Sequence, residues 1–122
     1  MPARKRFLKK EEGNVTCVRL VSVRAHEGSE AEVHRLFGEI GTHQQGLPGF
    51  MLALRFVSPT DPNEIVGMTV WDTREHADEH AQDQHIVALM SHLRASSDEN
   101  PITGDLFEVV IVRGELPAPV PG

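Results

Sequence analysis

Apolar side chains occupy both faces of three of the four stretches that resemble β-strands, and this feature constrains the fold most. In residues 15–25 (VTCVRLVSVRA), both phases of the strand alternation are apolar. Residues 50–57 (FMLALRFV) are apolar on both faces except at Arg55, and the stretch 109–112 within the strand expected over 106–112 is apolar without interruption. A strand of this kind is expected to be covered on both of its faces.

The predicted strands and helices follow one another in the order β-α-β-β-α-β. Gly28 ends the first strand, and Ser29 with Glu32 forms a capping-box pattern that opens a helix. The helix carries an apolar stripe at i, i+3, i+4 and i+7, made of Val33, Leu36, Phe37 and Ile40. The turn-rich residues 58–63 then join strands over 50–57 and 65–71.

The second helical region is predicted in two pieces. Asp72 or Thr73 caps the first piece, whose apolar positions are Ala77 and Ala81. The stripe of the second piece begins at Ile86 and does not continue back into the first. We therefore expect a short helix, a bend near 82–84 and a longer helix capped by Asp83.

These elements predict an α+β, ferredoxin-like domain with an antiparallel sheet. Two helices cover one face of a four-stranded sheet, so the second apolar face requires another layer. A second copy of the chain is the most economical layer, which predicts a homodimer through the sheet face. We expect a flexible basic arm over 1–12, the domain over 13–115 and a disordered Pro-rich tail over 116–122.

Charge and composition exclude several classes of function. The net charge is −6, and five of the twelve basic residues lie within the first ten positions, which argues against a nucleic-acid partner. No apolar run reaches the roughly 18 residues of a membrane span. Cys17 is the only cysteine, which precludes an intrachain disulfide and makes the cytoplasm the expected compartment.

Three stretches resemble the antibiotic biosynthesis monooxygenase-like family, whose members form dimeric α+β barrels. They are Leu47 to Phe50 at the turn into the second strand, Val70 to Asp72 at the end of the third, and the AxxHxxxxH spacing of Ala77, His80 and His85. The resemblance spans roughly residues 15–113. It implies a dimeric α+β barrel and an oxygenase that acts on a small aromatic substrate, a phenol or quinol, with no metal or flavin cofactor.

Two departures from the family pattern bear on that reaction. Polyketide-type members carry an Asn where this chain has Gly67. The haem-degrading branch has an Asn, a Trp and an iron-ligating His where our alignment places Val21, His80 and Met90. The resemblance therefore implies a site based on His80 and His85.

The candidate catalytic residues are His80 and His85, either of which could accept the substrate's proton. If Asp83 caps the helix, the helix dipole favours a neutral His85, whereas the Asp83 carboxylate favours the charged form. Trp71 is the candidate aromatic wall, and Arg19 and His43 are candidate stabilisers of a phenolate. Ordinary packing, or an Arg–carboxylate pair, accounts for the same residues.

His76 and His80 stand at i and i+4, a spacing that suits a metal ion, but the glutamate of an HExxH motif is missing, and we predict no metal site. Two alternative functions remain open. The first is a non-catalytic domain that binds a small ligand or assembles with a partner. The second is a haem-binding barrel.

Overall fold

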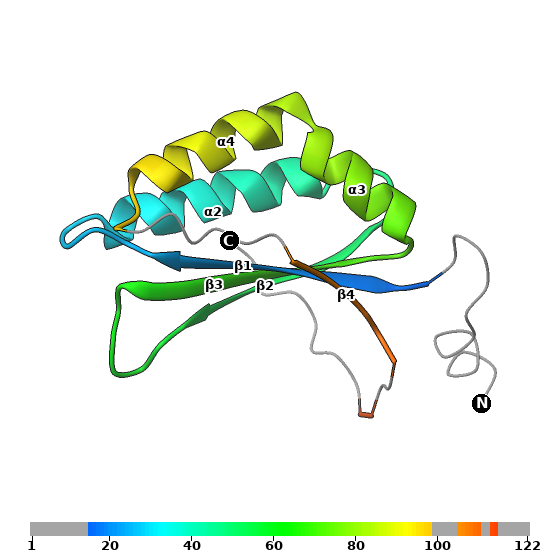
Figure 1. Cartoon of the computed structure of the whole chain (residues 1–122), viewed down its shortest axis with the longest axis horizontal. Coiled ribbons are helices and arrows are strands. Elements are labelled where there is room, and N and C mark those ends of the chain that lie inside the picture. Colours follow the sequence, from blue (N-terminus) through cyan, green and yellow to red (C-terminus); the bar gives the residue numbers. More distant parts are fainter. Residues whose placement is uncertain (1–14, 99–104, 111–112, 115–122) are drawn as a thin grey trace.

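The computed structural model describes residues 15–98, 105–110 and 113–114, and its elements follow the predicted order (Figure 1). The strands are β1 (Cys17–Arg24), β2 (Phe50–Val57), β3 (Glu64–Trp71) and β4 (Asp105–Glu108), and the helices are α2 (Glu30–Gln44), α3 (Arg74–Gln82) and α4 (Gln84–Ala95). No helix among the described residues is long and apolar enough to cross a membrane. The predicted arm over 1–12 and tail over 116–122 lie outside the described residues.

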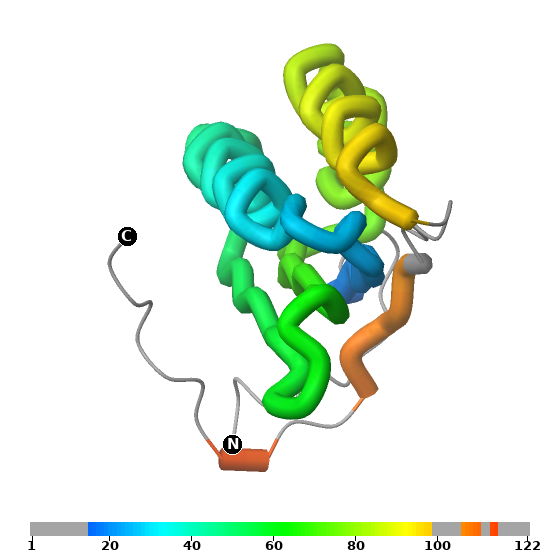
Figure 2. Tube along the Cα trace, turned by 90° about the vertical axis from the view of Figure 1, so that its left-hand side faces the viewer, coloured from blue at the N-terminus to red at the C-terminus, as the bar shows by residue number. Residues whose placement is uncertain are grey.

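The four strands form one antiparallel sheet in the order β2-β3-β1-β4. β1 pairs with β3 from Cys17 opposite Trp71 to Arg24 opposite Glu64. All three helices lie on the same side of the sheet, with α2 beside the α3–α4 pair (Figures 1 and 2). This is the predicted α+β, ferredoxin-like arrangement.

The last strand is shorter than predicted. β4 ends at Glu108, which pairs with Cys17, the first residue of β1. One further bond, from the Val109 N–H to the Thr16 carbonyl at 2.9 Å, extends the pairing. The prediction of strand at Val109 and Val110 is wrong because β1 has no strand residues left to pair with them, and positions 111–112 lie outside the described residues.

The predicted capping box at the start of α2 is also wrong, although Ser29 is the N-cap residue. The Ser29 side chain makes no capping bond, and its own N–H already donates to the His26 carbonyl at 2.8 Å. The Glu32 carboxylate instead accepts two hydrogen bonds from Arg35, at 2.7 and 2.8 Å. An ion pair within the helix has therefore replaced the reciprocal cap.

The predicted break between the last two helices is confirmed. Asp83 has extended backbone angles and follows α3 directly. Its Oδ1 accepts from the N–H groups of His85 and Ile86, at 3.0 and 3.1 Å, so Asp83 is the N-cap of α4. Thr73 caps α3 by accepting from the His76 N–H at 3.1 Å.

A continuous apolar core lies between the sheet and the pair α2–α4. Strand alternation directs Val23 of β1 and Ile65 of β3 toward these helices. The buried members are Val23, Ala25, Val33, Leu36, Ile40, Ile65, Ile86, Leu89 and Leu93.

None of the helices formed by the described residues lies on the opposite face of the sheet. The strand register places nine apolar side chains on it: Val18, Leu20, Leu52, Leu54, Phe56, Val66, Met68, Val70 and Phe107. Phe56 is 47% exposed and Phe107 is 50% exposed. The predicted apolar second face is thus present, and in this single chain part of it faces solvent.

Candidate active site

A cluster of polar and aromatic side chains replaces the apolar core beneath α3. Arg19 of β1 lies opposite Thr69 of β3, and Cys17 lies opposite Trp71, all on the helix-bearing face. Ala77 and His80 are the buried residues of α3. The structure thus brings together three of the five residues proposed for the site: Arg19, Trp71 and His80.

Trp71 is completely buried and anchors this cluster. Its indole N–H donates to the Thr69 hydroxyl at 2.9 Å. Its ring meets Phe50 edge-on with 5.7 Å between ring centres, and it lies 4.6 Å from the His80 ring at an interplanar angle of 32°. Three of its contacts are therefore specific ones that fix the orientation of the indole.

His80 is buried, with 7% of its surface exposed, and its Nε2 lies 2.9 Å from Nε2 of Gln44 on α2. Its Nδ1 is also buried, and among the described residues no atom forms a hydrogen bond with it. Burial, reinforced by the positive charge of Arg19, lowers the pKa of His80 to about 4. His80 is therefore neutral at pH 7.

Arg19 connects β1 to α3. One terminal nitrogen of its guanidinium donates to the Ala77 carbonyl at 3.3 Å and lies 3.5 Å from the Asp78 carboxylate. The Arg19 side chain is 13% exposed, whereas that of Asp78 is 55% exposed. The expected pairing of Arg19 with a protein carboxylate is confirmed, and the pair places a cation beside His80.

His43 and His85 form a separate cluster at the bend between α3 and α4. Their ring centres are 4.4 Å apart, and His43 Nε2 lies 3.0 Å from the Asp83 carboxylate. His85 is exposed, in contrast to His80. Asp83 thus connects the end of α2 to the start of α4. His85 belongs to this surface cluster because its ring contacts His43.

A third histidine, His76, lies where the Pro48-Gly49 turn meets Asp72 after β3. His76 Nδ1 lies 2.7 Å from the Asp72 carboxylate, and this bond raises the pKa of His76. Gly49 has a φ of +83°, and a Cβ there would come within 2.3 Å of Asp72 and 2.4 Å of His76. The Pro48-Gly49 turn therefore needs glycine both for its backbone angle and for this close approach.

Gly67 faces Phe37 of α2. A Cβ at Gly67 would lie 2.6 Å from the Phe37 ring. The Phe37 ring of α2 therefore fills the space that a side chain at position 67 of β3 would occupy. This packing accounts for the glycine at position 67.

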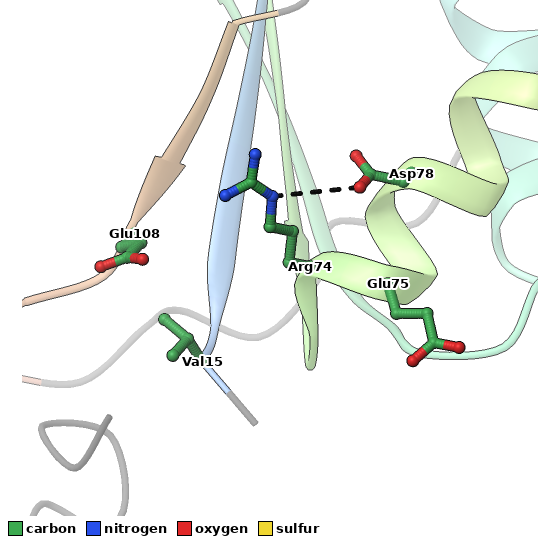
Figure 3. Close-up of a pocket in the computed structure, with 5 residues that line it drawn as sticks. All are labelled: Val15, Arg74, Glu75, Asp78 and Glu108. Atoms are coloured by element: carbon green, nitrogen blue, oxygen red, sulfur yellow. Dashed lines mark ion pairs between the residues drawn. The ribbon is translucent and has the colours of Figure 1, made fainter. Parts of the chain in front are cut away.

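A shallow depression of about 370 Å³ lies outside this cluster, between the start of β1, β4 and the outer face of α3 (Figure 3). Its lining residues are Val15, Arg74, Glu75, Asp78 and Glu108. Arg74 reaches toward Asp78, 3.9 Å away, in the close-up. None of the proposed site residues lines it, although Asp78 also pairs with Arg19.

Gln44 is the site residue that the sequence reading missed. It is 4% exposed and contacts His80 directly. The signal was present, because Gln44 continues the apolar stripe of α2 four residues beyond Ile40. A polar residue on such a stripe needs a buried partner.

In the part of the chain that the structure describes, the histidines are not arranged as ligands of one metal ion. His76 bonds Asp72, whereas His80 bonds Gln44. Within residues 15–98, 105–110 and 113–114, no group of three or more His, Cys, Asp or Glu side chains is arranged to hold a metal ion.

Comparison with solved structures identifies the same fold in several bacterial and archaeal proteins. A proposed antibiotic biosynthesis monooxygenase from Nitrosomonas europaea is 18% identical, with a TM-score of 0.73 over 87% of this chain and 100% of that one. SnoaB, a cofactor-independent oxygenase from Streptomyces nogalater, is 21% identical, with a TM-score of 0.64 over 88% of this chain and 100% of that one. A conserved protein from Methanosarcina mazei is 11% identical, with a TM-score of 0.70 over 76% of this chain and 91% of that one.

At these identities the likeness establishes the fold alone. No curated protein matches the chain. The sequence profile described as antibiotic biosynthesis monooxygenase matches residues 16–91, which include β1 and the cluster beneath α3. The chain therefore belongs to the antibiotic biosynthesis monooxygenase family.

Proposed function

We propose that this protein is a monooxygenase that oxidises a phenolic or quinol-like small molecule without a metal or flavin. One observation carries the proposal: Trp71, His80 and Arg19 lie together beneath α3. An aromatic wall, a neutral imidazole and a cation are the groups that an ionising phenol requires. The description of SnoaB as a cofactor-independent oxygenase supports the reaction class.

The chemistry places the reducing power in the substrate. A phenolate is electron-rich enough to react with O₂ at a ring carbon, and one oxygen atom stays on that carbon while the other leaves as water. The phenol and O₂ thus yield a quinone and water, and the substrate supplies the electrons. The protein contributes orientation, exclusion of water and stabilisation of the anion.

The proposed roles follow the two histidine clusters. Trp71, which is completely buried, forms the aromatic wall behind the His80 ring. Arg19 is proposed to balance the phenolate charge and His80 to contact the phenolic oxygen. His85 is the alternative proton acceptor and is the more accessible to solvent. His43, next to His85, is proposed to stabilise the anion if the proton leaves by that route.

Oxygen consumption with a panel of dihydroxynaphthalenes tests the reaction. His80→Ala is expected to lower turnover by about 10²- to 10⁴-fold, the range typical of a lost acid–base or hydrogen-bonding group. His26→Ala is the matched control, because His26 pairs with Asp98 on a half-exposed surface. Full turnover in both His80→Ala and His85→Ala would show that neither histidine takes part.

We also propose that the protein acts as a homodimer that closes a barrel through the helix-free face. The nine apolar side chains of that face, with Phe56 and Phe107 half exposed, support it. Burying such a face is favourable by about 25 cal/mol per Å² of apolar surface. A cytoplasmic location is proposed with it, on the ground that the lone Cys17 is buried and reduced.

Native mass spectrometry and light scattering test the dimer. The wild-type protein is expected at twice the chain mass, whereas Met68→Glu, in the middle of this face, is expected to yield monomer. Val87→Glu is the control, since Val87 is 50% exposed on α4, on the helix side. A wild-type protein that is monomeric at micromolar concentration would contradict the proposal.

A second candidate is a non-catalytic domain that binds a small ligand, haem included. The specific observation in its favour is Phe37, whose ring fills the space next to Gly67. Titration with haemin separates these functions. A Soret shift that saturates at one haem per chain, with no oxygen uptake on any quinol, would favour the binding domain.

A further inference from the structure

We infer that Gln44 is a positioning residue that holds the ring proton of His80 on Nδ1, so that His80 offers a neutral hydrogen-bond donor beside Arg19 to a phenolate or carbonyl oxygen of the ligand. The identity of the ligand rests on the proposed function. The tautomer does not, because it follows from contacts within the chain.

The Gln44–His80 contact sets the tautomer. The amide Nε2 of Gln44 lies 2.9 Å from the imidazole Nε2, and both residues are buried. An amide nitrogen is a donor only, so the imidazole nitrogen that faces it has to accept. A neutral imidazole with an accepting Nε2 carries its proton on Nδ1.

The donor created in this way has no acceptor among the residues that the structure describes. Nδ1 of His80 is buried and forms no hydrogen bond with any residue that the structure describes. A buried donor without a partner is destabilising, and native proteins rarely retain one without a role. A ligand oxygen that enters beneath α3 would supply the missing acceptor.

The surrounding charges select an oxygen that carries negative charge. Arg19 of β1 and His43 of α2 both disfavour a proton on His80, and Asp83 at the bend favours one. Asp78 of α3 pairs with Arg19 from its exposed side. A neutral N–H next to a guanidinium is thus an arrangement that favours an anionic acceptor.

This role differs from that of a general base. A base would need a free lone pair directed at the substrate, whereas here Gln44 occupies the accepting nitrogen. His80 would stabilise the anion by a hydrogen bond, and the proton of the phenol would leave by another route. Gln44 would act on the ligand only through His80.

Nitrogen-15 NMR of the wild-type protein at pH 7 tests the tautomer directly. The His80 signals, identified by their loss in His80→Asn, are expected to show a protonated Nδ1 and an unprotonated Nε2. Gln44→Glu, whose ionised side chain only accepts, is expected to move the proton to Nε2. Gln45→Glu is the matched control, because Gln45 is adjacent and exposed, and should leave the tautomer unchanged. A wild-type His80 protonated on Nε2 would overturn the inference.

Binding of 2-hydroxy-1,4-naphthoquinone, an anion at neutral pH, tests the ligand class. It is expected to shift the His80 Nδ1–H signal, whereas naphthalene, which has no oxygen, should not. His80→Leu is expected to weaken binding about 10- to 100-fold, as for a lost hydrogen bond to a charged group. His80→Asn keeps a nitrogen attached to Cγ, in the place of Nδ1, and should restore most of the affinity.

The two experiments separate this inference from the proposed function. A protonated Nδ1 and specific binding of the naphthoquinone, without oxygen uptake on any quinol, would leave the inference standing and refute the monooxygenase. Binding that leaves the Nδ1–H signal unchanged would overturn the inference, whatever the turnover.

Discussion

The helix-bearing face of the sheet divides into two regions that are packed in different ways. Toward one end, Val23 and Ile65 meet α2 and α4 in a continuous apolar core. Toward the other end, Arg19 of β1 donates to α3 and Thr69 of β3 accepts from Trp71, in a cluster held by directional contacts. Both regions are built from the same two central strands.

The difference shows how one layer combines stability with a polar site. The apolar region gains from burial without requiring a particular partner for each atom. In the region beneath α3, Trp71, His80 and Arg19 each depend on a named neighbour, and one buried nitrogen of His80 has none among the described residues. Asp83 marks the boundary, because the helix changes its direction there.

The largest expected effect lies in the apolar region. Leu93 is fully buried in α4, so Leu93→Ala should lower the free energy of unfolding by about 2–5 kcal/mol. Urea denaturation measures the loss, and the exposed neighbour Arg94→Ala should stay within about 0.5 kcal/mol of wild type. A loss below 1 kcal/mol for Leu93→Ala would mean that this region is not the stabilising one.

The polar region should make the free energy of unfolding depend on pH. Because the pKa of His80 falls to about 4 on folding, the unfolded chain binds the extra proton between pH 6.5 and 4. Stability should therefore decrease as the pH falls through this window, by up to about 3 kcal/mol. Above pH 6.5 His80 is neutral in both the folded and the unfolded chain, so this loss of stability is absent there.

Denaturation curves at several pH values measure that slope. In His80→Asn the part due to His80 should disappear, whereas His26→Asn should keep it. An unchanged slope in His80→Asn would show that His80 is not desolvated as the structure indicates.

The boundary between the two regions can be tested at Gly67. Gly67→Ala brings a methyl group within 2.6 Å of the Phe37 ring and should cost about 1–3 kcal/mol. Gly38→Ala, next to Phe37 in α2, meets nothing within 4 Å and should stabilise by about 0.5–1 kcal/mol. Equal effects of the two substitutions would contradict the packing of Phe37 on β3.

The smallest expected effect concerns the bend. Asp83→Ala removes the cap of α4 and the partner of His43, so it should cost about 0.5–2 kcal/mol. Ser29→Ala is the matched comparison, because Ser29 occupies an N-cap position without a side-chain bond, and it should be close to neutral. If both cost the same, the Asp83 bonds do not stabilise the bend.

Much of the fold could be predicted because it follows from local patterns. The bounds of β2, the break at Asp83 and the position of His85 in the first turn of α4 all follow from spacing and capping. The capping box at Ser29 failed because the bond from Ser29 to His26 and the pair of Glu32 with Arg35 compete with it. The predicted end of β4 was wrong because the length of a strand depends on the strand that it pairs with.

The candidate site was only partly predictable. The sequence pointed to His80 and His85 together, yet the tertiary structure separates a buried histidine on Gln44 from an exposed one on His43. Residues 36 positions apart in the chain, such as Gln44 and His80, meet only when α2 and α3 lie on the same sheet face. No periodicity along one element encodes that meeting.

The order of elements, like the doubly apolar strands and the two-piece last helix, can be predicted without the structure, because these features depend on side-chain periodicity and on residues close in the chain. Tertiary packing, in contrast, places Phe37 in the space beside Gly67 and Gln44 against His80. It also brings Arg19 close to both Asp78 and the buried imidazole. Burial and charge at a point in space depend on every element packed around it, and those distances exist only after the chain has folded.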